Sequence, residues 1–421
     1  MLRGSSSPMP SRLSRLRALV KSKGSPEDKA PPRPWRRRLR LGFVGAVVLL
    51  GEYVAATQVN PRLVPRTVDV VRAVFGPEFV AQLEDRVYGA KDRYDGWKNK
   101  DSAPKTYWEP EVAPVAPLQL SNASLDGGAP DGDAAAVMRA FPPAPFPPPI
   151  AAAATKVDGN WYPMADDVDP ASPVFVKTLV HPDAKRPYAA VAIVAMDLER
   201  VDLHMVAGTE EPSSETVKRN QRPGRVPDAD HARLIAAFNG GWQTIHGHFG
   251  MMVDGLALLP PKDKCCTVAL FKDGTLKIAP WTALSASAGD IQSYRQTPPC
   301  LREGGSHHAL LQDSSKNWGA AVDGATVIRR SAIGIDKDRK VLFYGVGDSL
   351  TALTIAEALG YAGAYDVAEL DVNAAFPRFL TYGHGKKDPT VKESLIPAIW
   401  KPGEYVTMSW YRDFFYVTRK P

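Results

Sequence analysis

A polar side chain precedes two glycines in the segment Ala236–Trp242, which reads Ala-Ala-Phe-Asn-Gly-Gly-Trp. Successive glycines permit backbone angles that other residues avoid, so their amides can approach a ligand closely. A concave run of N–H groups suits an anion, and the Asn239 amide both donates and accepts hydrogen bonds. Asn239, Gly240 and Gly241 therefore predict a ligand cradle, with Trp242 able to stack on a sugar face. The alternative is an ordinary turn.

A second candidate is Arg330, the first residue of the strand-like segment Arg330–Ile335. A guanidinium offers two parallel donors to phosphate oxygens and stays charged over the accessible pH range. Arg330 is therefore predicted to bind phosphate, and a strand-end salt bridge is the alternative. The neighbouring Arg329 should point to the opposite face of the strand, because successive side chains alternate.

A carboxylate at the end of an apolar run is suited to acid–base work at a cleft. Asp371 follows the apolar segment Gly363–Leu370 and is predicted to be catalytic. Glycosidic hydrolysis usually takes two carboxyl groups, about 5–5.5 Å apart for retention or about 6.5–9.5 Å apart for inversion. Asp254 is the predicted second group, with an Asp-Gly turn as its alternative. Asp348 and Glu369 are further candidates.

Two histidines, His246 and His248, share a loop that contains glycines. His248 is predicted as a proton donor and His246 as part of the substrate-binding wall, since imidazole titrates near neutral pH. The alternative is that both are ordinary loop histidines. No third ligand has a recognisable spacing, so the sequence predicts no metal site and no cofactor.

The three cysteines, Cys265, Cys266 and Cys300, fit neither a disulfide framework nor a zinc site. One of the adjacent pair could bond Cys300 in an oxidising compartment. The other interpretation is that all three are buried small hydrophobic side chains.

The positive charge of the chain is concentrated at its start. The whole chain has a formal charge of +6, but residues 1–40 alone hold 12 Lys/Arg and two Asp/Glu, so the rest sums to −4. A nucleic-acid-binding domain carries its basic patch on a folded face. The sequence therefore excludes nucleic acid as the expected partner.

Basic residues Arg36–Arg40 lead into Leu41–Val59, which is mostly apolar but contains Glu52. A spanning helix needs about 20 apolar residues, and basic residues hold their end in the cytoplasm. The segment predicts a single-pass membrane protein whose body lies in the periplasm or outside. A cleaved signal peptide, with small residues at Val54–Ala56, would secrete the body instead. A buried core helix is the third interpretation.

The chain is predicted to contain five segments. These are a disordered basic tail (1–40), the membrane anchor or signal (41–59), an amphipathic helical segment (60–100), a Pro/Ala-rich linker (101–160) and the folded body (161–421). In the helical segment, Phe79, Val80, Leu83 and Val87 form an apolar stripe that is expected to dock on the body, with a helix that lies on a membrane as the alternative.

The body is predicted to be α+β, with mixed sheets and flanking helices, because short strands are many and βαβ alternation is absent. Asp273-Gly274 marks a hairpin turn. The expected strands are Phe175–Val180, Ala189–Met196, Asp202–Ala207, Thr267–Phe271, Thr275–Ile278, Lys340–Val346 and Phe414–Thr418. The expected helices are Leu234–Phe238, which would continue a short helix capped by Asp228 or Asp230, and Ser349–Leu359, stopped by Gly360.

These motifs together resemble the phosphodiester glycosidase family over about Val174–Val417. The resemblance rests on the order and spacing of Ala236–Trp242, His246–Gly255, Arg330–Ile335 and Glu369–Asn373. One departure lies in the last motif, because Val372 and Asn373 replace two glycines of the family pattern. A ligand that relied on the amides of those glycines would lose them, although the Asn373 side chain could replace one contact.

The resemblance implies a hydrolase that cleaves the bond between an anomeric carbon and a phosphate in an envelope polysaccharide, teichoic-like polymer or glycolipid. Arg330 and Asn239–Gly241 would hold the phosphodiester, and Asp371 would act as base or nucleophile. A glycan-binding module that does not cut its ligand is the first alternative, supported by Val372 and Asn373. An envelope structural protein is the second.

Overall fold

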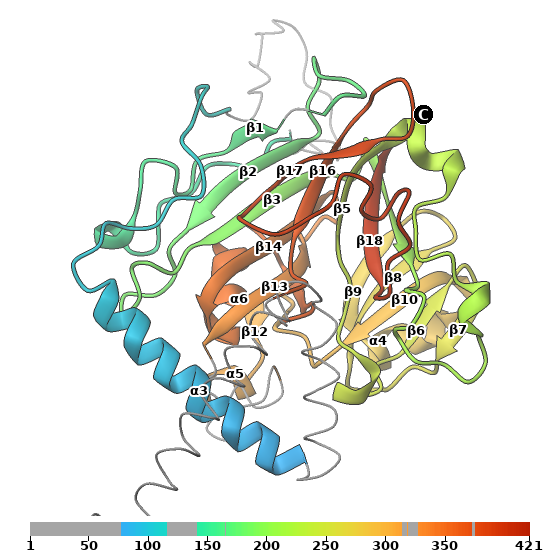
Figure 1. Cartoon of the computed structure of the whole chain (residues 1–421), viewed down its shortest axis with the longest axis horizontal. Coiled ribbons are helices and arrows are strands. Elements are labelled where there is room, and N and C mark those ends of the chain that lie inside the picture. Colours follow the sequence, from blue (N-terminus) through green and yellow to red (C-terminus); the bar gives the residue numbers. More distant parts are fainter. Residues whose placement is uncertain (1–76, 116–140, 165, 314–317, 319–326, 373–374) are drawn as a thin grey trace, which may run out of the picture. The chain divides into compact units, whose positions relative to one another are not determined.

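The computed structural model describes residues 77–115, 141–164, 166–313, 318, 327–372 and 375–421 (Figure 1). For residues 77–85 and 312–313 it describes the backbone alone. All of these residues belong to one compact unit, 68–421, of the two into which the chain divides. The expected basic tail and the apolar segment 41–59 lie outside the described residues. No helix of the described part is long and apolar enough to cross a membrane.

Three sheets make up the described part of the body (Figure 1). The first has the order β1 (Tyr162–Met164), β2 (Phe175–Val180), β3 (Val191–Asp197), β14 (Val341–Leu350), β13 (Ile328–Ile335), β15 (Asp366–Glu369), β11 (Arg302–Glu303), β12 (Ser306–His307). The second is β7 (Leu256–Leu259), β6 (Met251–Val253), β10 (Ile291–Thr297), β8 (Cys266–Phe271), β9 (Leu276–Pro280). The third is β17 (Thr390–Ser394), β16 (Phe379–Gly383), β5 (Leu234–Asn239), β18 (Phe414–Arg419), β4 (Val201–Val206).

Helices are few beside these sheets. The α-helices among the described residues are α3 (Pro77–Lys98), α4 (Trp281–Leu284), α5 (Leu310–Asp313) and α6 (Ala352–Tyr361). The 3-10 helices are η1 (Ala151–Ala153), η2 (Arg219–Gln221), η3 (Asp228–Arg233), η4 (Thr244–His246) and η5 (Ser285–Asp290). Neighbouring strands within the three sheets pair antiparallel. The described body is therefore made mostly of antiparallel sheet. This is a more specific fold than the mixed sheets with flanking helices that the sequence predicted.

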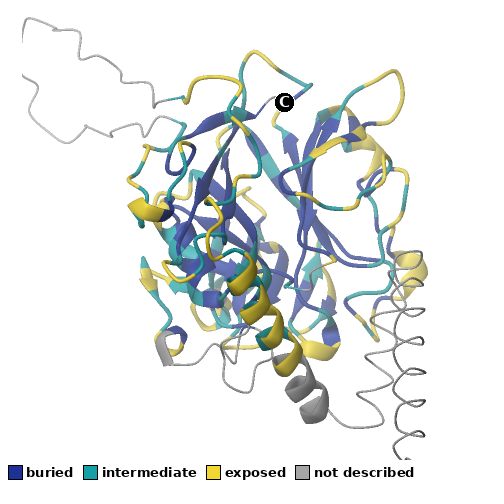
Figure 2. Ribbon diagram, turned by 60° about the vertical axis from the view of Figure 1, so that its left-hand side comes forward, coloured by how far each residue is buried: buried dark blue, intermediate teal, exposed yellow. Residues whose placement is uncertain are grey.

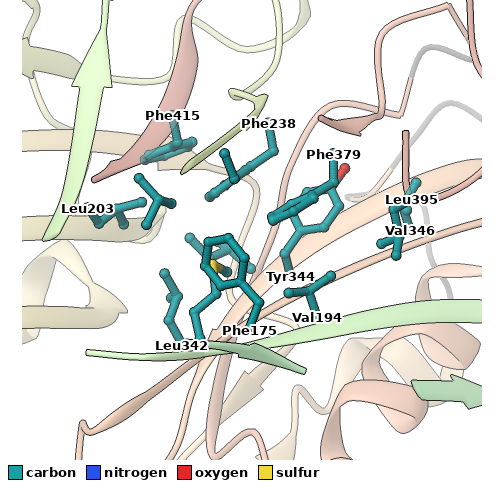
Figure 3. Packing of buried hydrophobic residues seen from close by; sticks show 14 of the residues in the cluster. Phe175, Val194, Leu203, Phe238, Leu342, Tyr344, Val346, Phe379, Leu395 and Phe415 are labelled. Carbon is teal, nitrogen blue, oxygen red and sulfur yellow. The ribbon is translucent and has the colours of Figure 1, made fainter. Parts of the chain in front are cut away.

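The main core includes side chains from both the eight-stranded sheet and the sheet that contains β5 and β18. Aromatic rings fill much of it, as Figure 3 shows for Phe238, Phe379 and Phe415. The Phe238 ring stacks on Phe379 at 5.8 Å and on Phe415 at 5.3 Å between centroids. Aromatic pairs at such distances add to the free energy of burial, so the end of β5 is firmly held.

The helix α6 packs with β3, β13 and β14 in a second core cluster. It was predicted over Ser349–Leu359 but begins at Ala352, because Thr351 caps it. The Thr351 hydroxyl accepts a hydrogen bond from the Thr354 backbone N–H at 3.1 Å, and a cap of this kind satisfies an otherwise unpaired donor. This cap shortens the helix from its predicted start.

The expected helix at Leu234–Phe238 is wrong, because these residues form most of the strand β5. Leu234–Phe238 is apolar at every position and is buried on both faces. Such a run has no hydrophobic periodicity, and without one the sequence cannot distinguish a short helix from a buried strand. Pairing with β16 on one side and β18 on the other decides the outcome. Asp228 lies in η3, which precedes this strand.

Part of the expected linker lies against the body. The Phe146 N–H donates to the Gly159 carbonyl at 3.0 Å. The Trp161 indole N–H donates to the Ala144 carbonyl at 3.3 Å, and its ring meets Phe146 edge-on at 6.1 Å. The proline-rich stretch 141–149 is therefore a packed strap in this region, and not a free spacer.

A disulfide joins Cys266 in β8 to Cys300, 34 residues later in the sequence. Both residues are fully buried, and Cys265 remains a free thiol with intermediate exposure. Of the two partners that the sequence left open, Cys266 is the one that bonds Cys300. A disulfide of this kind is typical of proteins from oxidising compartments.

We expect Cys300→Ser to lower the free energy of unfolding by about 3–4 kcal/mol, because the cross-link restricts a loop of this length in the unfolded chain. Urea unfolding of the purified protein measures the loss. Cys265→Ser is the matched control and should leave the midpoint unchanged. Equal stability of Cys300→Ser and the unmodified protein under oxidising conditions would contradict the cross-link.

Candidate functional site

Asn239 ends β5 and connects three elements through its side chain. Its Nδ2 donates to the Ser331 hydroxyl at 2.9 Å and to the Gly240 carbonyl at 3.1 Å. Its Oδ1 accepts from the Tyr344 hydroxyl at 2.7 Å and from the Arg378 backbone N–H at 3.2 Å. These bonds use both donors and both lone pairs of the amide, so Asn239 positions the turn that follows it.

The two glycines after Asn239 pack against Asp413. The Gly240 N–H donates to the Asp413 carbonyl at 3.0 Å, and the Gly241 N–H donates to the Asp413 carboxylate at 2.8 Å. The same carboxylate accepts from Arg295 Nε at 2.8 Å. Both glycine amides therefore already have an acceptor within the protein, so the predicted anion cradle is filled by the backbone carbonyl and the carboxylate of Asp413.

These contacts explain why the turn needs glycine. A Cβ on Gly240 would lie 2.1 Å from the Asp413 carboxylate and 2.6 Å from its carbonyl oxygen. A Cβ on Gly241 would lie 2.8 Å from the Arg295 guanidinium. The glycines serve close packing against a buried ion pair, and not an unusual backbone angle.

Gly240→Ala is therefore expected to cost about 3 kcal/mol or more of unfolding free energy, since the clash is with atoms that cannot move independently. Gly289→Ala is the matched control, because a Cβ there meets no atom within 4 Å. That control should change the unfolding free energy by less than about 1 kcal/mol. Chemical denaturation compares the two, and a neutral Gly240→Ala would refute the packing described.

The Asp371 carboxylate lies beside this turn and forms a buried ion pair with Arg412 at 2.6 Å. The Asp371 backbone is fixed on both sides, because its N–H donates to the Gly240 carbonyl at 3.1 Å and its carbonyl accepts from the Ser331 hydroxyl at 2.8 Å. Ser331 also accepts from Asn239. The structure therefore brings Asn239, Gly240 and Asp371 to one place.

Arg412 is the charged partner that sequence reasoning missed. Its Nη2 donates to the Gly241 carbonyl at 3.3 Å as well as binding Asp371, and its guanidinium lies 4.3 Å above the Phe376 ring. Its Nη1 is buried and has no hydrogen-bond partner in the described part of the chain. An unpaired buried donor is costly, so this atom is a candidate for binding a ligand oxygen.

Trp242 stands next to the turn with its indole N–H donating to the Leu370 carbonyl at 2.8 Å. The Trp242 ring is buried and meets the exposed His246 edge-on at 6.1 Å. His248 is exposed in the following loop, with φ of 48°. His246 is thus near the cluster through Trp242, and no described contact joins His248 to Asp371.

Arg330 occupies a different place from the one its predicted role requires. It is fully buried beside α6, where it pairs with the Glu369 carboxylate at 2.5 Å and donates to the Leu350 and Trp318 carbonyls. The alternative prediction for Arg330 was a strand-end salt bridge. Arg330 does form a salt bridge, but this bridge lies in the interior of the protein. In this arrangement Arg330 faces Glu369, while Arg412 faces Asp371.

Burial raises the pKa of Glu369 to about 7, and the charge of Asp371 adds to this, although Arg330 opposes it. One oxygen of Glu369, Oε2, lacks a hydrogen-bond partner in the described structure. A carboxyl group whose pKa is near neutral is suited to proton transfer. Its complete burial separates it from solvent, however, so its visible role is to balance Arg330.

We expect Glu369→Gln to change how stability depends on pH. A carboxyl group whose pKa is raised on folding contributes stability below its unfolded value of 4.5, and this is lost as the pH rises through about 7. The unfolding free energy of the unmodified protein should therefore fall relative to Glu369→Gln by up to about 3 kcal/mol over that interval. Glu199→Gln, an exposed substitution, is the control. Parallel curves would show that Glu369 is ionised when folded.

Asp254 and Asn373, the remaining predicted residues, are not part of the described cluster. Asp254 is exposed at the turn between β6 and β7, where its N–H donates to the Ser293 hydroxyl at 2.9 Å and its φ is 49°. Its placement matches the Asp-Gly turn of the alternative interpretation. Asn373 lies outside the described residues.

A cavity of about 500 Å³ opens on the side of β13 toward which Arg329 points. Its lining includes Arg329, Asp348, Lys105 and Val372. Arg329 Nε binds Asp348 at 2.7 Å, and Lys105 approaches the same carboxylate at 3.4 Å. Burial acts to raise the pKa of Asp348, but these two cations outweigh it and hold the pKa below its usual value. Successive side chains of β13 point to opposite faces, so Arg329 lines this cavity and Arg330 does not.

No group of three or more His, Cys, Asp or Glu side chains within the described residues is arranged to hold a metal ion.

Comparison with known proteins yields distant structural neighbours. The sequence matches no protein-family model, and no curated protein matches it either. Solved structures that resemble the fold include the catalytic domain of zebrafish N-acetylglucosamine-1-phosphodiester α-N-acetylglucosaminidase. It has 13% sequence identity and a TM-score of 0.37, over 62% of this chain and 88% of that one.

Two further neighbours are similarly distant. A hypothetical protein from Synechocystis has 9% identity and a TM-score of 0.37, over 58% of this chain and 62% of that one. An exported protein from Burkholderia pseudomallei has 9% identity and a TM-score of 0.33, over 61% and 76% of the two chains. The similarity is to a hydrolase domain and to proteins described as hypothetical or exported, and it is too low to assign an activity.

Proposed function

We propose that this protein is a hydrolase that cleaves the glycosidic side of a sugar phosphodiester. The observation that carries the proposal is the buried Asp371–Arg412 pair at the Gly240–Gly241 turn, with one guanidinium nitrogen left unpaired. The pair combines a carboxylate with an anion-binding group in one desolvated place. That is the combination required to attack an anomeric carbon while charge develops on a departing phosphate.

Arg412 takes the phosphate-binding role that the sequence suggested for Arg330. Its Nη1 would donate to a phosphate oxygen, while Nη2 keeps its contacts with Asp371 and Gly241. Phe376 beneath the guanidinium limits its movement. A guanidinium held in this way is preorganised to donate from its free nitrogen to one phosphate oxygen.

Asp371 would act as the base toward water or as the nucleophile toward the anomeric carbon. Its main chain is held by Gly240 and Ser331, and a rigid support of this kind keeps a catalytic group in its productive geometry. A phosphate monoester is a good leaving group, so the reaction needs no strong general acid. The substrate would be an envelope or extracellular glycan or a glycolipid.

The proposed location is the outer side of a membrane, to which the segment 41–59 would tether the body. The Cys266–Cys300 disulfide supports an oxidising compartment. The basic residues before the segment favour a cytoplasmic N-terminus. Secretion after cleavage within 41–59 would place the body in the same compartment.

A glycan-binding module that does not cut its ligand is the second candidate. It is favoured by the amides of Gly240 and Gly241, which are engaged by Asp413 and leave no cradle for a phosphate. Val372 adds to this argument, because it stands where the resemblance expects a glycine. Binding would then rely on side chains, with Arg412 the main one.

The full-length protein should release free sugar and a phosphomonoester from members of a panel of α- and β-linked sugar phosphodiesters. Asp371→Asn is expected to lower kcat by about 10²–10⁴-fold, because the isosteric amide cannot act as base or nucleophile. Arg412→Lys should raise KM and lower kcat, since a lysine cannot hold both Asp371 and the phosphate. Chromatography of the released sugar and phosphomonoester measures both effects.

Asp166→Asn is the matched control, because Asp166 is also a buried carboxylate paired with an arginine, Arg419, but lies away from the turn. Its activity should equal that of the unmodified protein. Binding of the panel without cleavage would favour the glycan-binding module. Full activity of Asp371→Asn would refute the site, and absence of both binding and cleavage would refute both candidates.

A further inference from the structure

The helix α3 turns a polar stripe toward the body. Tyr88, Asp92 and Asp95 recur every three or four residues, so they lie on one face of the helix. Asn99 continues this stripe directly after the helix ends, and all four side chains are partly buried. The Asp92 carboxylate receives two hydrogen bonds from Arg186, at 2.8 and 2.6 Å. This bidentate pair joins the helix to the loop before β3.

The opposite face of α3 exposes large apolar side chains. Val87 is 56% exposed, Tyr94 57% and Trp97 74%. Their spacings of seven and three residues place them on one side of the helix, and the Tyr94 and Trp97 rings lie 6.0 Å apart. In Figure 2 most of the described part of this helix is coloured as exposed. The predicted docking of the apolar stripe on the body is therefore wrong for Val87.

Charge is segregated between the two faces in the same way. Every exposed charged side chain from residue 86 to residue 100 is basic. Lys91 lines the cavity beside the body and pairs with Asp95, and Lys100 follows the helix. The outward face of the helix therefore carries Arg86, Arg93 and Lys98. The acidic side chains of this stretch, Asp92 and Asp95, are partly buried. The outward face is therefore apolar, aromatic and positively charged.

We propose that this outward face of α3 lies on the surface of a membrane that contains anionic lipids. Tyrosine and tryptophan favour the membrane–water interface. Basic side chains beside them are attracted to anionic head groups. A second copy of the chain fits this face less well, because two basic surfaces would repel each other.

The sequence upstream places such a surface within reach. Seventeen residues separate the apolar segment Leu41–Val59 from Pro77, where α3 begins. Those residues span at most about 60 Å when fully extended. A membrane contact of α3 would orient the body relative to the bilayer, and it would do so whether or not the protein hydrolyses sugar phosphodiesters.

The test uses the full-length protein with vesicles of phosphatidylcholine and phosphatidylglycerol whose acyl chains are brominated, which quench nearby tryptophan emission. All variants carry Trp35→Phe, because Trp35 lies just before the proposed membrane tether and would itself be quenched. In this background we expect the emission to fall when brominated lipid replaces ordinary lipid, and Trp97→Phe to remove most of that fall. Trp400→Phe, which alters a partly buried tryptophan of the body, is the matched control and should keep it. Arg93→Gln combined with Lys98→Gln should reduce the quenching to the level seen with phosphatidylcholine alone.

Equal quenching in Trp97→Phe and the parent Trp35→Phe protein would overturn the proposal, and so would absence of any association with the vesicles. A second copy as the occupant is tested with Tyr94→Cys in a Cys265→Ser background. If this variant forms disulfide-linked dimers and brominated lipid quenches no tryptophan emission, the membrane proposal is also overturned. Neither readout depends on catalytic activity, so failure here is distinct from failure of the proposed function.

Discussion

The Asp413 carboxylate holds the point at which the three sheets meet. It binds the Gly241 N–H at the end of β5 in the third sheet and the Arg295 guanidinium from β10 in the second. The Gly240 carbonyl accepts from Asp371, which follows β15 of the first sheet. A buried carboxylate or guanidinium is costly alone and is stable only with its partner. The geometry of the turn therefore depends on the complete pair.

Buried arginine–carboxylate pairs surround this junction. Arg378 donates to Glu404 at 2.6 Å, and Arg295 binds Asp413 at 2.8 Å. Arg412 is built in the same way on Asp371, but it retains a buried nitrogen with no partner in the described structure. Of these three ion pairs of the described structure, the Asp371–Arg412 pair alone has a buried guanidinium nitrogen without a partner. This difference is the physical basis for placing chemistry there.

The two faces of α3 show how an ion pair decides what a helix presents to its surroundings. Hydrophobic burial alone would turn the side of Val87 and Trp97 inward. The bidentate Asp92–Arg186 pair instead fixes the polar side against the body. The apolar surface then remains open to a further partner, and the basic residues around it select an anionic one.

Local patterns in the sequence were sufficient for much of the strand framework. The strand Phe175–Val180 was predicted with its observed bounds, and Asp273-Gly274 marked the β8–β9 hairpin, because both signals involve only neighbouring residues. Leu234–Phe238 was misread, since a uniformly apolar run has no period and only its neighbours β16 and β18 make it a central strand.

For the site, the sequence by itself indicated that the glycines after Asn239 allow a close approach of the backbone and that Arg329 and Arg330 face opposite ways, whereas the catalytic role of Asp371 stays a prediction. Only the tertiary structure decided which arginine meets which carboxylate. Arg412 lies 41 residues beyond Asp371 in the sequence, and no local pattern connects them. An ion pair across such a separation depends on how sheets pack, and that packing is a property of the whole chain.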